Sequence, residues 1–299
     1  MESAPAMKIT PTGKTLGATI EDIDLNIPLS DGDFRTILRA LGEYGVLCFT
    51  KQDLTPDNHA TFGARFGAPD VNVAASGAHE PGHPEMMILS NMKQAGKPLG
   101  LHDAGQDWHT DMSYNQVIAL ANILHAREVP TRHGMPLGET QFRNMHKAYE
   151  DLPEELKTKL EGRTATHDFN KYWEISLSRP GTTRKPLTEE QRRKRPPVSH
   201  PVFMTHPITG RNILYANPGY TMWIDGMDRA ESDAITDFLF RHQTRLDYQY
   251  AHHWAVGDVL MWDNIGTVHY AVADYMPDEA RYMRRLQIMA TLDYPALVA

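Results

Sequence analysis

Short apolar runs separated by turn residues constrain the fold of this chain more than any other feature. From residue 85 onward, stretches rich in valine, isoleucine, leucine and aromatic residues alternate with glycine, proline and asparagine. Many short strands joined by such turns are typical of a jelly roll or a related barrel. The sequence therefore predicts strands at residues 85–91, 118–129, 139–144, 202–206, 211–217, 246–256, 258–264 and 284–294.

Helices accompany the first strands of the chain. Two strand-like runs near the N-terminus precede a segment in which apolar residues recur at three- and four-residue spacing, as on one face of a helix. Ser30 or Asp31 can cap this helix and Gly45 can end it. A second short helix is expected to start at Thr55, its N-cap, with Pro56 at the first helical position.

The sequence predicts a single domain. Strand signals continue after the proline- and arginine-rich stretch 178–197, so no linker divides the chain, and no internal repeat is present. We expect one domain over residues 1–299 that is mostly β with helical inserts. Its core at 85–299 is predicted to be a double-stranded β-helix (jelly-roll, cupin-like) flanked by α-helices, with helical and strand decoration at 1–84. The inserts are expected near residues 145–162 and 228–245.

Composition and charge narrow the class of function. With 41% hydrophobic and 23% charged residues, the chain has the composition of a globular protein. A net charge of −8 argues against a nucleic-acid groove, and the basic run at 189–197 is interpreted as a solvated loop. The single cysteine, Cys48, fits a reducing compartment and is expected to be a buried, inert thiol. Without a signal peptide or a membrane-length apolar run, we expect a cytoplasmic protein.

The segment QDWHTDMSYNQ, residues 106–116, holds a histidine and an aspartate two positions apart. If the segment is extended, His109 and Asp111 project from the same face. In a chain with 15 histidines, this pair alone is weak evidence for a metal site. Two imidazoles and one carboxylate on one face of a metal are the arrangement of non-haem Fe(II) oxygenases. His269, which follows the strand at 258–264, is the candidate third ligand.

Two arginines near the C-terminus can share an interior face. Arg281 and Arg285 are four positions apart, which places both on one side of a strand. A buried arginine is costly unless an anion neutralises it, and a guanidinium binds carboxylates in bidentate geometry. A dicarboxylate co-substrate would supply that anion. Without the histidines and aspartate, pairing of Arg281 and Arg284 with surface acids such as Asp278 or Glu279 would be favoured.

Several segments together resemble the taurine dioxygenase and 2,4-dichlorophenoxyacetate dioxygenase (TauD/TfdA) family of Fe(II)/2-oxoglutarate-dependent enzymes. The resemblance extends over nearly the whole chain. Several independent motifs in the right order are far more specific than any one of them. They are GATIEDIDL, ARFGAP, DWHTDMSY, HPVFMTHPITGRNILYANPGYT, GDVLMWDNIGTVHYAVADY and the closing strand with its arginines.

The resemblance implies a ligand set and a co-substrate site. Arg281 would hold the distal carboxylate of 2-oxoglutarate, and Thr140 would add a hydroxyl to that carboxylate. The approach to Thr140 is longer than the family pattern, so Thr131 is the alternative. O2 would be the second co-substrate. The ligands of Fe(2+) would be His109, Asp111 and His269.

The resemblance also implies a substrate pocket. Arg285 matches the family arginine that faces acid groups of the substrate, so we expect an anionic substrate. Phe169 and Tyr220 fall where the family places aromatic walls, although core packing explains such residues equally well. Asn72 lies near a substrate-contacting segment. The taurine enzyme's pattern has a histidine near this position, and its absence here weakens a taurine assignment.

Two classes of function follow from these observations. The resemblance implies a dioxygenase that hydroxylates, and can thereby cleave, a small anionic molecule such as a sulfonate, phenoxy acid, alkyl sulfate or amino-acid-like compound, with release of succinate and CO2. The alternative is a non-redox cupin-like metalloprotein, a zinc hydrolase or isomerase, or a small-acid binding protein. The arginine strand favours the dioxygenase. We expect no nucleic-acid or membrane partner, and a homo-oligomer (dimer or tetramer) is compatible with the sequence.

Overall fold

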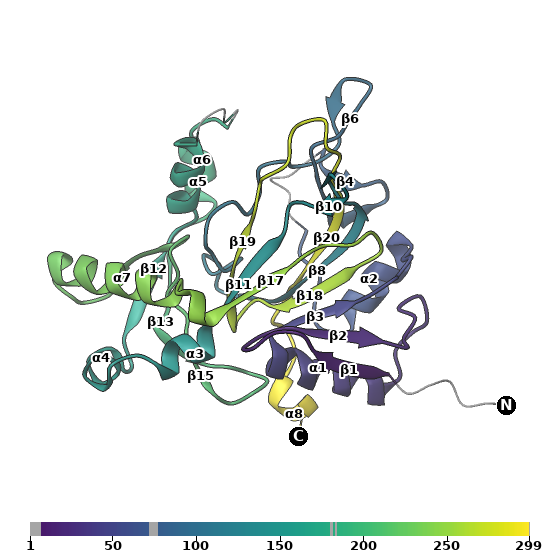
Figure 1. Cartoon of the computed structure of the whole chain (residues 1–299). Coiled ribbons are helices and arrows are strands. Elements are labelled where there is room, and N and C mark those ends of the chain that lie inside the picture. Colours follow the sequence, from purple (N-terminus) through teal and green to yellow (C-terminus); the bar gives the residue numbers. More distant parts are fainter. Residues whose placement is uncertain (1–6, 72–76, 180–181, 183, 299) are drawn as a thin grey trace.

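One large sheet forms the centre of the computed structural model, which describes residues 7–71, 77–179, 182 and 184–298 (Figure 1). Its strands lie in the order β1-β2-β3-β18-β8-β20-β5-β4. The β2 and β3 strands are parallel, and the other neighbouring pairs are antiparallel. The bounds are β1 Lys8–Pro11, β2 Ala18–Glu21, β3 Val46–Phe49, β4 His79–Glu80, β5 His83–Ser90, β8 Ala119–Glu128, β18 Val259–Asp263 and β20 Tyr282–Met289.

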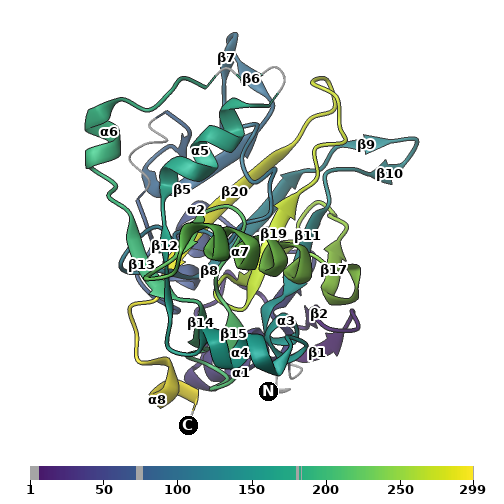
Figure 2. The same ribbon diagram turned by 90° about the vertical axis from the view of Figure 1, so that its left-hand side faces the viewer.

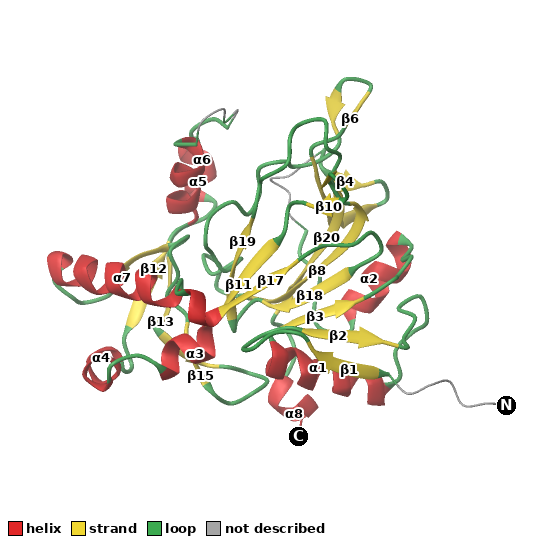
Figure 3. Ribbon diagram, viewed as in Figure 1, coloured by secondary structure: helices red, strands yellow, loops and turns green. Residues whose placement is uncertain are grey.

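A second, smaller sheet packs against one face of the large sheet. Its order is β17-β11-β19, with bounds Gln249–His252, Thr140–Asn144 and Thr267–Ala271. The ring of Phe142 in β11 lies 5.5 Å from that of Trp262 in β18, so side chains of the two sheets meet in a shared interior. Strands predominate in the described part of the chain, and these sheets remain open rather than closing into a barrel (Figure 3).

Alternating side chains separate the two faces of the large sheet. In β18, Val259 and Met261 join the core under the N-terminal helices, whereas Leu260 and Trp262 join the core between the sheets. This period of two is the side-chain repeat of a strand. The residues of β18 are buried on both faces, which explains why its sequence is apolar throughout.

Two helices cover the outer face of the large sheet. Helix α1, Asp31–Tyr44, begins after Ser30, whose side chain accepts a hydrogen bond from the Asp33 amide, and ends at Gly45 with φ of 65°. Helix α2, Pro56–Ala64, has Thr55 as its N-cap. The expected caps of both helices are therefore confirmed.

A further group of strands and helices lies beside the two sheets in Figure 1 and faces the viewer in Figure 2. It contains the sheet β13-β12-β16 and the hairpin β14-β15, whose strands pair across the turn in THPITGRN. Two further two-stranded ribbons project from the large sheet region. The remaining bounds are β6 Lys93–Gln94, β7 Lys97–Pro98, β9 Thr131–Arg132, β10 Met135–Pro136, β12 Thr164–His167, β13 Val198–Pro201, β14 Phe203–Thr205, β15 Asn212–Leu214, β16 Thr221–Ile224, α3 Met145–Glu150, α4 Glu154–Leu160, α5 Phe169–Leu177, α6 Glu189–Arg193, α7 Arg229–Gln243 and α8 Tyr294–Val298.

Three expected elements differ from the structure. The insert near 145–162 is two helices, α3 and α4, because Pro153 cannot continue the first one. The strand expected at 246–256 starts with a 3-10 turn at Leu246–Tyr248. The strand expected at 284–294 starts earlier and ends at Met289, and the chain then turns into α8. The second insert, near 228–245, is confirmed as α7.

None of the helices in the described part of the chain is both long and apolar enough to cross a membrane.

Histidine burial makes the stability of this fold depend on pH. The side chain of His59 in α2 is fully buried, with its ring 6.1 Å from that of His125. Burial lowers the pKa of His59 from 6.5 to about 3, and the charges of His125 and Arg284 act in the same direction. Below the ordinary pKa, the unfolded chain therefore binds a proton at this position that the folded chain does not.

We predict that the free energy of unfolding falls as the pH drops below 6.5 and that His59→Gln makes this fall shallower. Between wild type and His59→Gln, the slope of the free energy of unfolding against pH should differ by up to about 1.4 kcal/mol per pH unit. Urea unfolding at about pH 7.5 and about pH 5 measures it. His253→Gln, with a side chain 68% exposed, should keep the wild-type slope. An equal slope in His59→Gln and wild type would contradict the prediction.

Candidate metal centre

The backbone of the QDWHTDM segment pairs with strand β19. The His109 amide donates to the His269 carbonyl at 3.2 Å, and the His269 amide donates to the His109 carbonyl at 2.8 Å. This isolated antiparallel bridge places the two imidazoles side by side, with ring centres 4.2 Å apart. Residues 160 positions apart in the sequence are thus held together by two backbone hydrogen bonds.

The Asp111 carboxylate completes a cluster with these two histidines. Its Oδ1 lies 3.5 Å from His109 Nε2, and its Oδ2 lies 3.5 Å from His269 Nε2. All three side chains are buried, and one donor atom from each lies within 4.8 Å of the others. The structure therefore brings together the three residues that the sequence analysis proposed as metal ligands.

A hydrogen bond fixes which nitrogen of His109 faces the cluster. The Nδ1 atom lies 2.6 Å from the Asp107 carbonyl oxygen, which can only accept, so Nδ1 carries the proton. The other ring nitrogen of His109, Nε2, faces Asp111. Metal-bound histidines usually donate their other ring N–H in this way.

The protonation states of the cluster suit a divalent cation. Burial alone would raise the pKa of Asp111, but the Arg285 guanidinium and the two imidazoles hold it well below its usual range. Burial lowers the pKa of His269 to about 4, with the charge of His109 acting in the same direction. At neutral pH the site thus offers an ionised carboxylate and a neutral imidazole at His269, the forms that bind metals.

The loop that follows β18 holds the backbone of Asp111. The Asp111 amide donates to Asn264 Oδ1 at 3.0 Å, and Asn264 Nδ2 donates to the Asp111 carbonyl at 2.9 Å. The Thr110 hydroxyl lies 2.7 Å from the Asn264 carbonyl and 2.6 Å from that of Thr267. The sequence analysis did not single out Asn264, although it directly follows the last residue of β18 in the WDN run.

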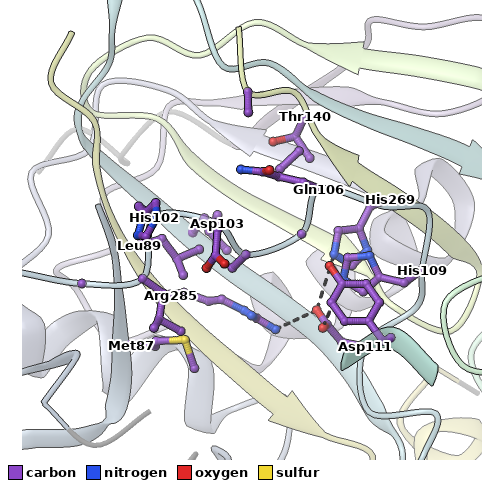
Figure 4. Close-up of a pocket in the computed structure, with 18 of the residues that line it drawn as sticks. Met87, Leu89, His102, Asp103, Gln106, His109, Asp111, Thr140, His269 and Arg285 are labelled. Atoms are coloured by element: carbon purple, nitrogen blue, oxygen red, sulfur yellow. Dashed lines mark hydrogen bonds and ion pairs between the residues drawn. The ribbon is translucent and has the colours of Figure 1, made fainter. Parts of the chain in front are cut away.

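A cavity of about 490 Å³ opens onto the three side chains. The guanidinium of Arg285 points at Asp111 from the side opposite the histidines (Figure 4). Its Nη2 donates to Asp111 Oδ2 at 2.7 Å, and Nε and Nη2 donate to Asn122 Oδ1 at 3.0 and 2.8 Å. Arg285 therefore orients the carboxylate as well as lining the cavity.

Arg281 lines the same cavity in a different setting. It is 7% exposed, and within the described ranges no carboxylate lies within 4.0 Å of its guanidinium. Burial lowers its pKa, and the Nε atom lacks a hydrogen-bond partner among the described residues. Its charge is therefore available to an anion. Arg284, on the opposite face of β20, instead pairs with Glu80 at 3.0 Å.

Thr140 also reaches the cavity, from the first position of β11. It is 3% exposed, and its hydroxyl accepts a hydrogen bond from Trp254 Nε1 at 3.1 Å. The hydroxyl proton is then free to donate to a ligand. Thr131 is exposed in the β9-β10 ribbon and does not line the cavity. The structure therefore favours Thr140 over Thr131.

The two predicted aromatic residues line the cavity, with further rings beside them. The Tyr220 ring lies 6.2 Å from that of His109, and Phe169 starts α5. Tyr114 and Tyr172, which the sequence analysis did not assign, fill the space around Tyr220 at 4.7 and 5.2 Å between ring centres. Asn72 lies outside the described residues.

Among the described residues, possible ligand atoms also lie within 4.8 Å of one another in two other buried clusters, His146 with His206 and Asp263, and Cys48 with His252 and Asp258. In the first, His206 Nδ1 accepts from the Ile208 and Thr209 amides, so its proton is on Nε2, 2.9 Å from Asp263 Oδ2. This tautomer has no lone pair for a metal at Nε2.

In the second cluster, His252 bonds to Asp258 at 3.1 Å beside Cys48. Burial raises the pKa of the Cys48 thiol, which keeps it protonated, as expected of an inert cysteine. Neither cluster opens onto the large cavity through these side chains. His109, Asp111 and His269 are therefore the candidate metal centre.

Comparisons with known proteins agree with this geometry. The family model for "Taurine catabolism dioxygenase TauD, TfdA family" matches residues 8–287. Pentalenolactone F synthase of Streptomyces avermitilis is 32% identical over 303 residues, covering 97% of this chain and 96% of that protein. The alpha-ketoglutarate-dependent 2,4-dichlorophenoxyacetate dioxygenase of Cupriavidus pinatubonensis is 33% identical over 272 residues, covering 87% of this chain and 90% of that protein.

Solved structures are similar over the same length. A taurine dioxygenase from Burkholderia xenovorans has a TM-score of 0.76 at 28% identity, covering 95% of this chain and 91% of that one. AAD-2 in complex with Mn(II) and N-oxalylglycine has a TM-score of 0.77 at 27% identity, covering 96% and 99%. The chain belongs to the TauD/TfdA family. The expected cupin-like fold class and the class of Fe(II)/2-oxoglutarate-dependent dioxygenase, with O2 as co-substrate, are thereby confirmed.

Gly219 provides a test of how closely the site is packed. A Cβ atom at this position would lie 2.6 Å from His109 Cβ and 3.3 Å from the Trp108 carbonyl oxygen. We predict that Gly219→Ala displaces His109 and weakens Mn(II) binding about 10- to 100-fold, as changes around metal ligands commonly do. Electron paramagnetic resonance of free Mn(II) measures the affinity.

The matched control for this variant is Gly32→Ala in α1, where the added Cβ would meet its nearest neighbour at 3.6 Å. It should bind Mn(II) as the wild type does. If Gly219→Ala were folded by circular dichroism and bound Mn(II) with wild-type affinity, the prediction would be wrong. Close packing of residue 219 against His109 would then not control metal binding.

Proposed function

We propose that His109, Asp111 and His269 bind Fe(II) and that Arg281 and Thr140 bind the distal carboxylate of 2-oxoglutarate. The observation that carries this proposal is the buried Arg281 guanidinium, which lines the cavity of the three ligands and lacks a carboxylate partner in the described part of the chain. Burying such a charge is costly without an anion. A dicarboxylate with one end at the metal and the other at Arg281 would neutralise it.

The reaction that we propose is hydroxylation of a small, anionic organic substrate. Iron with 2-oxoglutarate and O2 supplies the oxidant in this family, with succinate and CO2 as the other products. The protein's residues position the reactants and exclude water. Where the hydroxylated carbon carries oxygen, nitrogen or sulfur, the product can cleave. Sulfonates, phenoxy acids, alkyl sulfates and amino-acid-like compounds are the candidate substrates.

Individual side chains have defined tasks in this proposal. Arg285 keeps Asp111 ionised and oriented through the 2.7 Å hydrogen bond, and its position in the cavity wall allows it to contact the substrate's acid group. Thr140 donates its hydroxyl proton to 2-oxoglutarate while Trp254 holds its oxygen. Phe169 and Tyr220 pack against the substrate, and Asn72 remains a proposed contact. A zinc hydrolase would leave Arg281 without a role, so we favour the dioxygenase over that alternative.

The 2-oxoglutarate site is tested by Arg281→Ala. Loss of hydrogen bonds to a charged group costs about 1.5–3 kcal/mol, so the dissociation constant of 2-oxoglutarate should rise roughly 10- to 150-fold. Calorimetric titration of the anaerobic Mn(II)-loaded protein measures it. Mn(II) affinity itself should stay unchanged.

The control for this titration is Arg127→Ala, because Arg127 pairs with Asp53 on the surface and is absent from the cavity wall. It should bind 2-oxoglutarate as the wild type does. An Arg281→Ala variant that retained both Mn(II) and wild-type 2-oxoglutarate affinity would refute the proposed co-substrate site.

A further inference from the structure

Four arginines line the cavity, and their partners differ. The guanidinium of Arg184 donates to both carboxylate oxygens of Asp103, at 2.7 and 2.9 Å. Arg285 bonds to Asp111. Among the residues that the structure describes, no carboxylate lies within 4.0 Å of Arg195 or Arg281. Arg281 is assigned to the co-substrate above, which leaves the charge of Arg195 unexplained.

Arg195 packs its guanidinium against two aromatic rings at the cavity wall. It follows α6, it is half-buried, and its guanidinium carbon lies 4.3 Å from the centre of the Phe169 ring and 5.8 Å from that of Tyr114. A guanidinium over a ring face is held in place by the ring's quadrupole while its N–H groups stay free at the edge. Burial raises the pKa of Asp70, and the charge of Arg195 acts in the opposite direction, although the two groups are too far apart to form an ion pair.

A continuous row of rings leads from Arg195 to the metal centre. Ring centres lie 4.9 Å apart between Phe169 and Tyr114, 4.7 Å between Tyr114 and Tyr220, and 6.2 Å between Tyr220 and His109. Burial raises the pKa of the Tyr114 and Tyr220 hydroxyls, so this row stays uncharged at neutral pH. The rings are tilted or edge-on to one another, and such an apolar wall can pack against aromatic or other apolar groups.

The co-substrate site lies on a different wall. The Arg281 guanidinium carbon lies 5.9 Å from the centre of the Tyr275 ring, and its Nε is 3.4 Å from the Cβ position of Gly138, whereas the aromatic neighbours of Arg195 are Phe169 and Tyr114. The two guanidiniums, neither of which has a carboxylate partner among the described residues, therefore have different neighbours in one cavity.

We propose that Arg195, rather than Arg285, binds the acid group of the substrate and thereby determines its class, because the Arg285 guanidinium already donates to Asp111 and Asn122. The substrate is a carboxylate or sulfonate with an aromatic or similarly apolar body, which lies along the row from Phe169 to Tyr220. The carbon that reacts is at the end remote from the acid group. This inference rests on the proposed function, because it takes the metal centre as the site of oxidation.

Binding of simple aryl acids to the anaerobic protein loaded with Mn(II) and 2-oxoglutarate tests the inference without turnover. The probes are 3-phenylpropionate, 4-phenylbutyrate, 4-phenylbutanesulfonate and the neutral amide of each carboxylate, titrated by calorimetry. The wild type should bind at least one acid more tightly than its neutral counterpart. Arg195→Gln should weaken binding of that acid about tenfold or more and leave the amides unchanged, and Arg195→Lys should restore part of the loss.

The control variant is Arg192→Gln in α6, where Arg192 is exposed and lies 3.8 Å from Glu174. It should bind all probes as the wild type does. The inference is overturned if no acid probe binds the wild type, or if Arg195→Gln weakens an acid and its amide equally. Mn(II) and 2-oxoglutarate affinities are recorded in the same samples. If the wild type bound neither Mn(II) nor 2-oxoglutarate, the proposed function would be refuted. If both bound normally and Arg195→Gln left binding of the acid unchanged, only the role of Arg195 would be refuted.

Discussion

The ionised carboxylate of Asp111, buried between two imidazoles and a guanidinium, is the interaction on which the rest of the site depends. A buried carboxylate is costly unless it is paired, and Arg285 supplies that pairing at 2.7 Å. The pair is neutral as a whole, so a divalent cation entering between Asp111, His109 and His269 adds positive charge to the site. An anionic co-substrate would balance that charge together with the charge of Arg281, which has no carboxylate partner in the described part of the chain.

Strand pairing places these charges. In the small sheet, β11 pairs with β19 so that Phe142 is opposite His269 and Thr140 is opposite Ala271. In β20, Met283 and Arg285 face the interior while Arg284 faces outward to Glu80. A shift of one residue in either register would reverse the faces. The site is therefore a direct consequence of how the two sheets pair and pack.

The sequence predicted much of this arrangement because strand periodicity and motif order are local signals. Alternation placed Arg281 and Arg285 on one face, and the WDN-to-His269 motif supplied the third candidate ligand. It did not reveal Asn264 as the partner of Asp111, because a hydrogen bond across 153 residues leaves no local pattern. The lateral sheet and helix α5 were also missed. Arg195 was read as part of a solvated loop, since its aromatic support comes from distant Phe169 and Tyr114.

The central claim is that three distant side chains form one metal site with a cationic anchor for the co-substrate. Anomalous X-ray diffraction from crystals grown with Mn(II) and N-oxalylglycine tests it most directly. The account predicts one strong peak bound by His109, Asp111 and His269, with the far carboxylate of N-oxalylglycine at Arg281. A peak at the Cys48 or His206 cluster instead, or a ligand carboxylate away from Arg281, would contradict it.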